Sequence, residues 1–169
     1  MLTKEKLEAM KLLKKEFEAL KTNPITSLGV TVGLVNENNI FQWKISMVGP
    51  ADTPYAGGVF FLQADFPDSY PRNGPKIRFL TKIFHCNVFD WGICISTLNH
   101  WKPTPMEKVL SDIFALFYAN NPDNQEQPSR EFRSNKKLFE QHCREWVQKY
   151  AKPQIANREY EESWDFSFP

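Results

Sequence analysis

Four short segments between residues 30 and 80 alternate apolar and polar side chains, and this alternation limits the possible folds more than any other feature. A period of two residues is typical of strands that bury one face of a sheet. Short connections rich in Gly, Pro and Asn separate the segments, so the chain predicts a four-stranded antiparallel meander. Within the third connection, Gly74-Pro75 is a candidate cis peptide. The predicted strands are Val30–Leu34, Ile40–Val48, Val59–Phe66 and Lys76–Leu80.

On either side of these strands the apolar period changes to that of a helix. Apolar residues recur at intervals of three and four over Thr3–Leu20, and lysines occupy much of the remaining surface. Thr104-Pro105-Met106-Glu107 has the pattern of a capping box, which predicts a helix to about Ala119. Ser129 and Ser134 are candidate caps of a short helix and of a last long one. The predicted fold class is α+β: a helix, four strands, a long loop and three helices.

Length and composition limit the class of protein. A chain of 169 residues fits one domain, expected over residues 1–152, and an acidic, aromatic extension follows over residues 153–169. Two interpretations of this extension stay open. It either docks on a partner, or it packs on the domain or is disordered. Basic and acidic side chains nearly balance, 21 against 20, so neither nucleic acid nor a membrane surface is expected as a partner.

The compartment is predicted from two further features. Charged residues interrupt the first twenty positions, unlike a signal peptide, and no apolar run reaches the length of a membrane span. The three cysteines have no disulfide-like spacing, which favours the cytoplasm or the nucleus. We expect a monomer there.

The segment from His85 to Trp101 holds most of the residues that could perform covalent chemistry. Loops of about twenty residues inside a compact domain are usually functional. The remaining cysteine, Cys143, lies on the apolar stripe of the last predicted helix, where a thiol is inert. The candidates in the segment are two cysteines, two histidines and an asparagine: His85, Cys86, Asn87, Cys94 and His100.

Three kinds of chemistry are compatible with these side chains. A zinc site would use both cysteines and both histidines, although structural zinc sites usually have closely spaced ligand pairs. A hydrolase would pair Cys94 with His85 or His100 as its base. An acyl carrier would hold its cargo as a thioester on Cys94, and the Asn87 amide would stabilise the oxyanion. The side chains alone leave these three open.

The motifs of the chain, taken together and in order, resemble the catalytic domain of ubiquitin-conjugating enzymes over about residues 4 to 151. The matching residues are Trp43, Gly49-Pro50, Thr53-Pro54-Tyr55, Gly57-Gly58-Val59-Phe60, Phe66-Pro67, Tyr70-Pro71, Pro75-Lys76, His85, Asn87, Gly92-Ile93-Cys94-Ile95, Trp101, Pro103, Asn121-Pro122-Asp123, Arg144-Glu145-Trp146 and Gln148-Lys149-Tyr150-Ala151. The resemblance implies the UBC-like fold. It also implies that Cys94 accepts ubiquitin, or a ubiquitin-like protein, from an activating enzyme and passes it to a substrate lysine or a ligase cysteine. No cofactor is expected, because the activating enzyme spends the ATP.

The resemblance implies roles for the residues around Cys94. Asn87 matches the asparagine of the family's H-P-N motif, which stabilises the oxyanion or holds the active-site loop. His85 matches a structural residue. Ser96 and Asn124 stand at two positions that are acidic in members that modify lysine, so Asp123 is the candidate substitute acid for the incoming amine. Transfer to lysine and transfer to ligase cysteines alone both stay open.

The resemblance also implies a docking surface. Lys11 and Lys15 match basic positions used for the activating enzyme and the ligase. Arg72 replaces an exposed Phe in one ligase-binding loop, and Lys102 and Pro103 lie in the other. The expected partners are therefore ubiquitin, a ubiquitin-activating enzyme and a ubiquitin ligase of the RING or HECT type.

The chain departs from the family within the H-P-N motif, which is His85-Cys86-Asn87 here. Replacing proline by cysteine frees a backbone φ, so we expect a looser loop around Asn87. The spacings from Asn87 to Cys94 and from Cys94 to Trp101 are each one residue shorter than in common members. A ubiquitin-like cargo and a non-catalytic module that only positions ubiquitin remain the alternatives.

Overall fold

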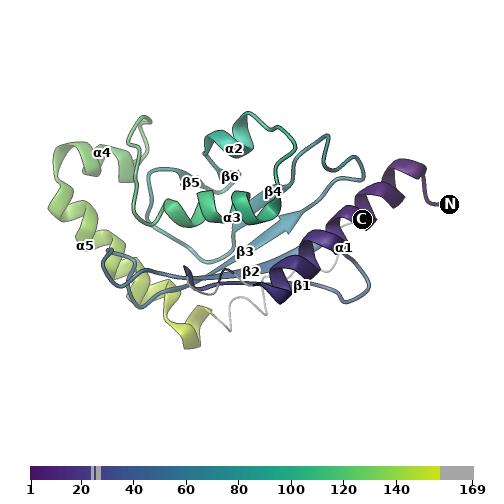
Figure 1. Ribbon diagram of the computed structural model, residues 1–169. Helices are drawn as coiled ribbons and strands as arrows, with labels where there is room; N and C mark the ends of the chain where they lie inside the picture. The colour runs from purple at the N-terminus through teal and green to yellow at the C-terminus, as the bar shows by residue number, and fades with distance from the viewer. Residues whose placement is uncertain (24, 26–27, 157–169) are drawn as a thin grey trace.

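A four-stranded antiparallel sheet forms the centre of the computed structural model, which describes residues 1–23, 25 and 28–156 (Figure 1). The strands are β1 (Val30–Leu34), β2 (Gln42–Val48), β3 (Val59–Asp65) and β4 (Lys76–Phe79). Their spatial order follows the sequence, so the predicted meander is confirmed. The register pairs Ile45 of β2 with Val32 on one side and Leu62 on the other. Trp43, Ile45 and Met47 alternate along β2 and are all buried, as the period of two predicts.

Helices from both ends of the chain cover this core. Helix α1 (Lys4–Thr22) buries Leu13 and Phe17, and the Phe17 ring lies 5.3 Å from that of Trp43. Helix α3 (Met106–Ala115) buries an apolar stripe that joins the same core. The chain then continues through α4 (Gln127–Ser134), α5 (Lys136–Trp146) and the π-helical turn η2 (Val147–Ala151). The α+β fold class is therefore confirmed.

The predicted caps of the last two helices are wrong. Ser129 is buried inside α4, whose N-cap residue is Glu126. Ser134 ends α4, and the next residue, Asn135, caps α5 by accepting a hydrogen bond from the Leu138 N–H at 3.1 Å. Asn is as good an N-cap as Ser, so sequence preference alone could not choose between two adjacent residues.

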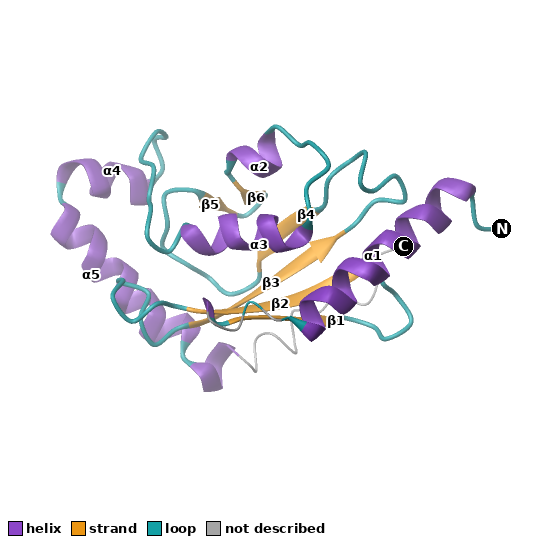
Figure 2. Cartoon of the chain, viewed as in Figure 1, coloured by secondary structure: helices purple, strands orange, loops and turns teal. Residues whose placement is uncertain are grey.

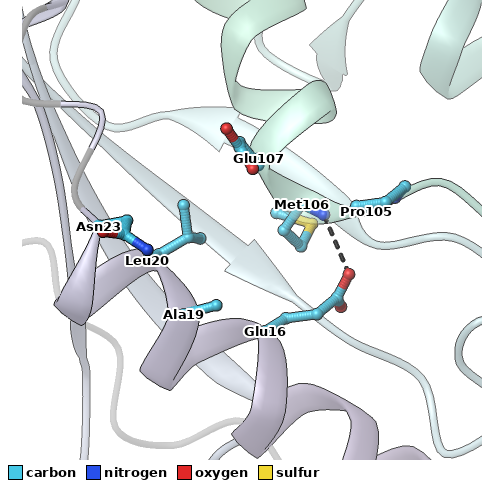
Figure 3. Close-up of a pocket in the computed structure, with 7 residues that line it drawn as sticks. All are labelled: Glu16, Ala19, Leu20, Asn23, Pro105, Met106 and Glu107. Atoms are coloured by element: carbon cyan, nitrogen blue, oxygen red, sulfur yellow. Dashed lines mark hydrogen bonds between the residues drawn. The ribbon is translucent and has the colours of Figure 1, made fainter.

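The predicted capping box of α3 is also wrong, because Thr104 is not the residue that caps the helix. Its hydroxyl donates to the Lys102 carbonyl at 2.6 Å, and the helix begins at Met106. The Met106 N–H donates instead to Glu16 Oε1 on α1 at 3.2 Å (Figure 3). Glu16 Oε2 accepts the Tyr70 hydroxyl proton at 2.6 Å. One carboxylate therefore ties α1 both to the start of α3 and to the loop after β3.

The segment predicted to be an irregular loop contains three short elements. Strands β5 (Val88–Phe89) and β6 (Gly92–Ile93) form a hairpin beside β4, and helix α2 (Ser96–Asn99) follows (Figure 2). Gly92 has a φ of 147°, a conformation that other residues rarely adopt, and it completes the tight hairpin turn. Elements of two to four residues are too short to produce a recognisable period.

Two loops on the α1 side of the molecule pack against each other. The cis peptide lies at Tyr70-Pro71, so the prediction of Gly74-Pro75 is wrong. Gly74 allows a close approach instead, because a Cβ atom there would lie 2.5 Å from the Trp101 ring. Trp101 Nε1 donates to the Pro71 carbonyl at 2.8 Å, which fixes the loop after α2 to the loop after β3.

The predicted C-terminal extension lies outside the described residues from position 157 onward. Before that point, the backbone N–H groups of Ile155 and Ala156 both donate to the Lys152 carbonyl. Within the part of the chain that the structure describes, no helix combines the length and apolar character needed to cross a membrane.

The role of Glu16 predicts a measurable loss of stability. Glu16→Ala removes the acceptor of both the Tyr70 hydroxyl and the Met106 N–H, and we expect the free energy of unfolding to fall by about 2 kcal/mol in urea denaturation. Glu16→Gln should cost less, because a side-chain oxygen remains. Glu18→Ala, an exposed change on the same helix, is the matched control and should change stability by less than about 0.5 kcal/mol. Equal losses for Glu16→Ala and Glu18→Ala would contradict this account.

Candidate active site

Cys94 is the accessible thiol of the chain. It directly follows β6 and is partly exposed, whereas Cys86 and Cys143 are each only 1% exposed. Its backbone N–H donates to the Asn87 carbonyl at 2.9 Å and so extends the β5–β6 hairpin by one more pair. Burial raises the pKa of Cys143 to about 12 and also raises that of Cys86. Neither buried thiol is therefore suited to act as a nucleophile near neutral pH. The predicted inertness of Cys143 fits this burial.

A surface pocket of about 430 Å³ opens beside Cys94. Its lining includes apolar residues from the end of α3 and polar residues from three separate segments. Among the lining residues in the described part of the chain, Asp123 is the one carboxylate. The polar residues are Asn87, Ser96, Asn99, His100, Asn120, Asn121 and Asp123.

The Asn87 side chain holds two segments of this pocket together. Its Nδ2 donates to the Asn121 carbonyl at 3.0 Å, and its Oδ1 accepts the Asn121 N–H at 2.8 Å. This reciprocal pair, here called the Asn87–Asn121 clamp, copies the way in which two strands pair. It ties the β5–β6 hairpin to the segment after α3, and Asn87 is 4% exposed. Of the two roles implied for Asn87, these contacts favour holding the active-site loop.

His85 is a buried, neutral ring that positions Asn87. Its Nε2 lies 2.7 Å from the Leu116 carbonyl, which can only accept, so Nε2 carries the proton. Nδ1 then accepts the Asn87 N–H at 2.9 Å. Burial lowers the pKa of His85 to about 4, although hydrogen bonds to the carbonyls of Leu116 and Ala119 oppose the shift. Because both ring nitrogens are engaged, His85 cannot serve as the base of a hydrolase.

The second candidate base, His100, is exposed and lines the pocket just after α2. Among the hydrogen bonds of the described residues, none joins its ring to the Cys94 sulfur. The described residues also include no group of three or more His, Cys, Asp or Glu side chains that could hold a metal ion. The contacts at Cys94 therefore support neither the hydrolase nor the zinc hypothesis.

The expected loosening of the loop by Cys86 stays a prediction, and two hydrogen bonds to the Cys86 backbone oppose it. The Cys86 N–H donates to Asn120 Oδ1 at 2.8 Å, a bond that a proline could not make. The Cys86 carbonyl accepts a hydrogen bond from Asn124 Nδ2, also at 2.8 Å. Two asparagines after α3 therefore fix the backbone at the position where the family has a rigid proline.

The residues at the family's two acidic positions have separate environments. Ser96 is exposed at the start of α2 and lines the pocket. Asn124 holds the backbone, since its Oδ1 also accepts the Glu126 N–H at 3.0 Å. Asp123 is exposed at the pocket, and its Oδ2 accepts a hydrogen bond from Asn121 Nδ2 at 3.2 Å. Of the three, Asp123 alone provides a carboxylate to the pocket.

Sequence reasoning missed Asn99. Its Nδ2 lies 3.2 Å from the Cys94 sulfur, and Asn99 ends the short helix α2. Helix α2 is attached to α3 by a hydrogen bond from the Thr97 hydroxyl to Asp112, a carboxylate that also pairs with Lys108. Burial raises the pKa of Asp112, but hydrogen bonds from Lys108 and Thr97 outweigh it and the net shift is downward. No sequence signal identified Asn99, because the helix that carries it was not predicted.

The predicted docking residues lie on neighbouring elements. Lys11 and Lys15 are exposed on α1. Arg72, in the loop after β3, forms an ion pair with Glu5 of α1. Lys102 and Pro103 are exposed next to Trp101, whose indole binds the loop that carries Arg72. The structure therefore brings the two loops together beside α1.

The family model described as "Ubiquitin-conjugating enzyme" matches residues 12–147. The matched range includes the whole sheet, the pocket beside Cys94 and both loops next to α1.

The buried His85 predicts how stability depends on pH. Its pKa rises from about 4 in the folded chain to an ordinary 6.5 on unfolding, so the unfolded chain binds more protons between these values. The free energy of unfolding should therefore fall by about 3 kcal/mol through this group as the pH drops from 6.5 to 4. In His85→Gln this component disappears, which denaturation at several pH values would reveal. The exposed His100→Gln should follow the wild type, and parallel curves for wild type and His85→Gln would contradict the prediction.

Proposed function

The chain belongs to the ubiquitin-conjugating enzyme family, and we propose that it accepts ubiquitin from an activating enzyme as a thioester on Cys94. The Cys94 thiolate attacks the acyl carbon of the ubiquitin thioester on the activating enzyme. A new carbon–sulfur bond forms, and the sulfur of the activating enzyme leaves as a thiolate, so no net oxidation occurs. One observation carries the proposal: the Cys94 sulfur is accessible at a pocket, whereas the other two thiols are buried.

In the second step, the acyl group passes to a substrate lysine or to a ligase cysteine. An attacking amine must lose a proton, and a lysine is almost fully protonated at neutral pH. Asp123 is the carboxylate at the pocket, and its position supports a role in orienting the amine and receiving its proton. A ligase cysteine reacts as a thiolate and needs no carboxylate to receive a proton. Both acceptors fit the site, and Asp123 favours lysine transfer.

The face that includes α1 and the two loops beside it is the proposed docking surface for the activating enzyme and a RING or HECT ligase. Lys11 and Lys15 give α1 exposed positive charge. Arg72, Lys102 and Pro103 lie on the loops joined by Trp101. We further propose a cytoplasmic or nuclear location, since the chemistry requires Cys94 to remain a free thiol.

Charging with purified components tests the first step. Incubation with a ubiquitin-activating enzyme, ATP and ubiquitin should give an adduct that thiol reagents cleave. Cys94→Ala should give none, and Cys94→Ser should give an adduct that resists thiols, because an oxyester replaces the thioester. Cys143→Ala, which alters a buried thiol, is the matched control and should charge normally. Charging only with a ubiquitin-like protein would mean that this protein, and not ubiquitin, is the cargo. No charging with any modifier would mean that the chain is a non-catalytic binding module.

The role of Asp123 is tested by single-turnover discharge of the ubiquitin-charged protein. Asp123→Asn should slow discharge to free lysine by about 10²-fold and leave discharge to free cysteine unchanged. Asp90→Asn removes the same charge from the hairpin next to Cys94 and should discharge normally to both. Equal rates for wild type and Asp123→Asn with lysine would contradict the proposed role. Discharge of the wild type to cysteine alone would make the protein a donor for cysteine-based ligases.

A further inference from the structure

Asn99 places an amide group against the reacting atom of the site. Its Nδ2 lies 3.2 Å from the Cys94 sulfur, and among the described hydrogen bonds this sulfur is the one partner of the Asn99 side chain. The resemblance implies no role for Asn99. We propose that Asn99 is a catalytic residue that donates a hydrogen bond to the Cys94 thiolate and, during transfer, to the oxyanion. The first half of this proposal concerns the free thiol, and the second half rests on the proposed function.

The Asn87 side chain, which the resemblance implies as the oxyanion donor, is held in the clamp by two hydrogen bonds. Asn87 uses its Oδ1 and an N–H of its Nδ2 in the clamp with the Asn121 backbone. It is also 4% exposed, so swinging the side chain out of the clamp would leave the Asn121 N–H and carbonyl without these bonds. Asn99 is exposed, and among the described hydrogen bonds its side chain has no comparable bonds to the backbone. The contacts therefore favour different roles for the two asparagines. Asn87 holds the loop, and Asn99 provides the hydrogen-bond donor at the Cys94 sulfur.

Helix α2 fixes the backbone that carries Asn99 before any substrate arrives. The Asn99 N–H donates to the Ile95 carbonyl at 2.9 Å, next to Cys94 in the chain. Thr97 bonds to Asp112 on α3, and Leu98 packs against the core. A donor that is already oriented costs no reorganisation during the reaction, which is what makes such groups effective in catalysis.

The proposed bonds are compatible with both steps of the reaction. When the Cys94 thiolate attacks, the acyl oxygen becomes negative two bonds away from the sulfur, within reach of an amide that already contacts the sulfur. When the acceptor attacks the charged enzyme, the carbon–sulfur bond breaks and Cys94 leaves as a thiolate. An N–H directed at the sulfur stabilises that leaving group. The proton that the acceptor loses goes to the base that deprotonates it, and no oxidant or reductant is needed.

Alkylation of the free enzyme tests the contact without any ubiquitin. Iodoacetamide modifies the thiolate, and mass spectrometry of the Cys94 peptide gives its rate at each pH. Asn99→Ala should slow alkylation at pH 7 about fivefold, because the thiolate loses its hydrogen-bond donor. Asn99→Asp keeps the shape but replaces the donor by a negative acceptor, so it should slow alkylation further. Asn38→Ala, an exposed asparagine in the β1–β2 turn, is the matched control and should leave the rate unchanged.

Single-turnover discharge tests the role in transfer. Asn99→Ala, once charged, should discharge to free lysine and to free cysteine more slowly by about 10²-fold, because both acceptors pass through an oxyanion. An effect on both acceptors separates Asn99 from Asp123, which concerns lysine alone. Unchanged alkylation in Asn99→Ala and Asn99→Asp would overturn the contact, and unchanged discharge would overturn the catalytic role. If the wild type did not charge at all, the proposed function would fail while the alkylation result would still stand.

Discussion

The proposed active site depends on the Asn87–Asn121 clamp. A single buried side chain satisfies both backbone groups of a residue 34 positions away, and so it joins the β5–β6 hairpin to the segment after α3. The hairpin presents Cys94, and the segment presents Asp123. His85 supports the clamp from behind, since it exists in one tautomer and accepts the Asn87 N–H. Buried polar groups are costly unless they are paired, so the buried side chains of His85 and Asn87 favour the geometry in which these bonds form.

The replacement of proline by Cys86 has a local compensation. Proline fixes its own φ, whereas Cys86 is held through hydrogen bonds from both sides of its backbone, to Asn120 and Asn124. Asn120 also donates to the Tyr55 hydroxyl at 3.3 Å, and Tyr55 in turn donates to the Phe84 carbonyl at 2.8 Å. The resemblance implies an acid at the position of Asn124; in this chain Asn124 binds the backbone, and Asp123 is the carboxylate among the described residues that line the pocket.

The parts of the fold that depend on periodicity could be predicted from the sequence. The four strands, α1 and α3 all repeat an apolar spacing over several turns or pleats, and burial follows that spacing. Features that depend on distant partners could not be predicted. Glu16 caps α3 from 90 residues away, so the local Thr104 was misjudged as the cap. Helix α2 has four residues and no measurable period. The contact between Asn99 and Cys94 depends on this helix, so it could not be predicted either.

The division of roles between the two asparagines is the central claim, and side-chain amide NMR measures it most directly. The 15N–1H resonances of Asn99 and Asn87 would be followed while Cys94 is titrated from neutral to alkaline pH, with Cys94→Ala as the reference. The account predicts that the Asn99 amide moves as the thiolate forms, that this movement is absent in Cys94→Ala, and that the clamped Asn87 amide hardly responds. An Asn87 amide that moves with the thiolate beside an unresponsive Asn99 would contradict it.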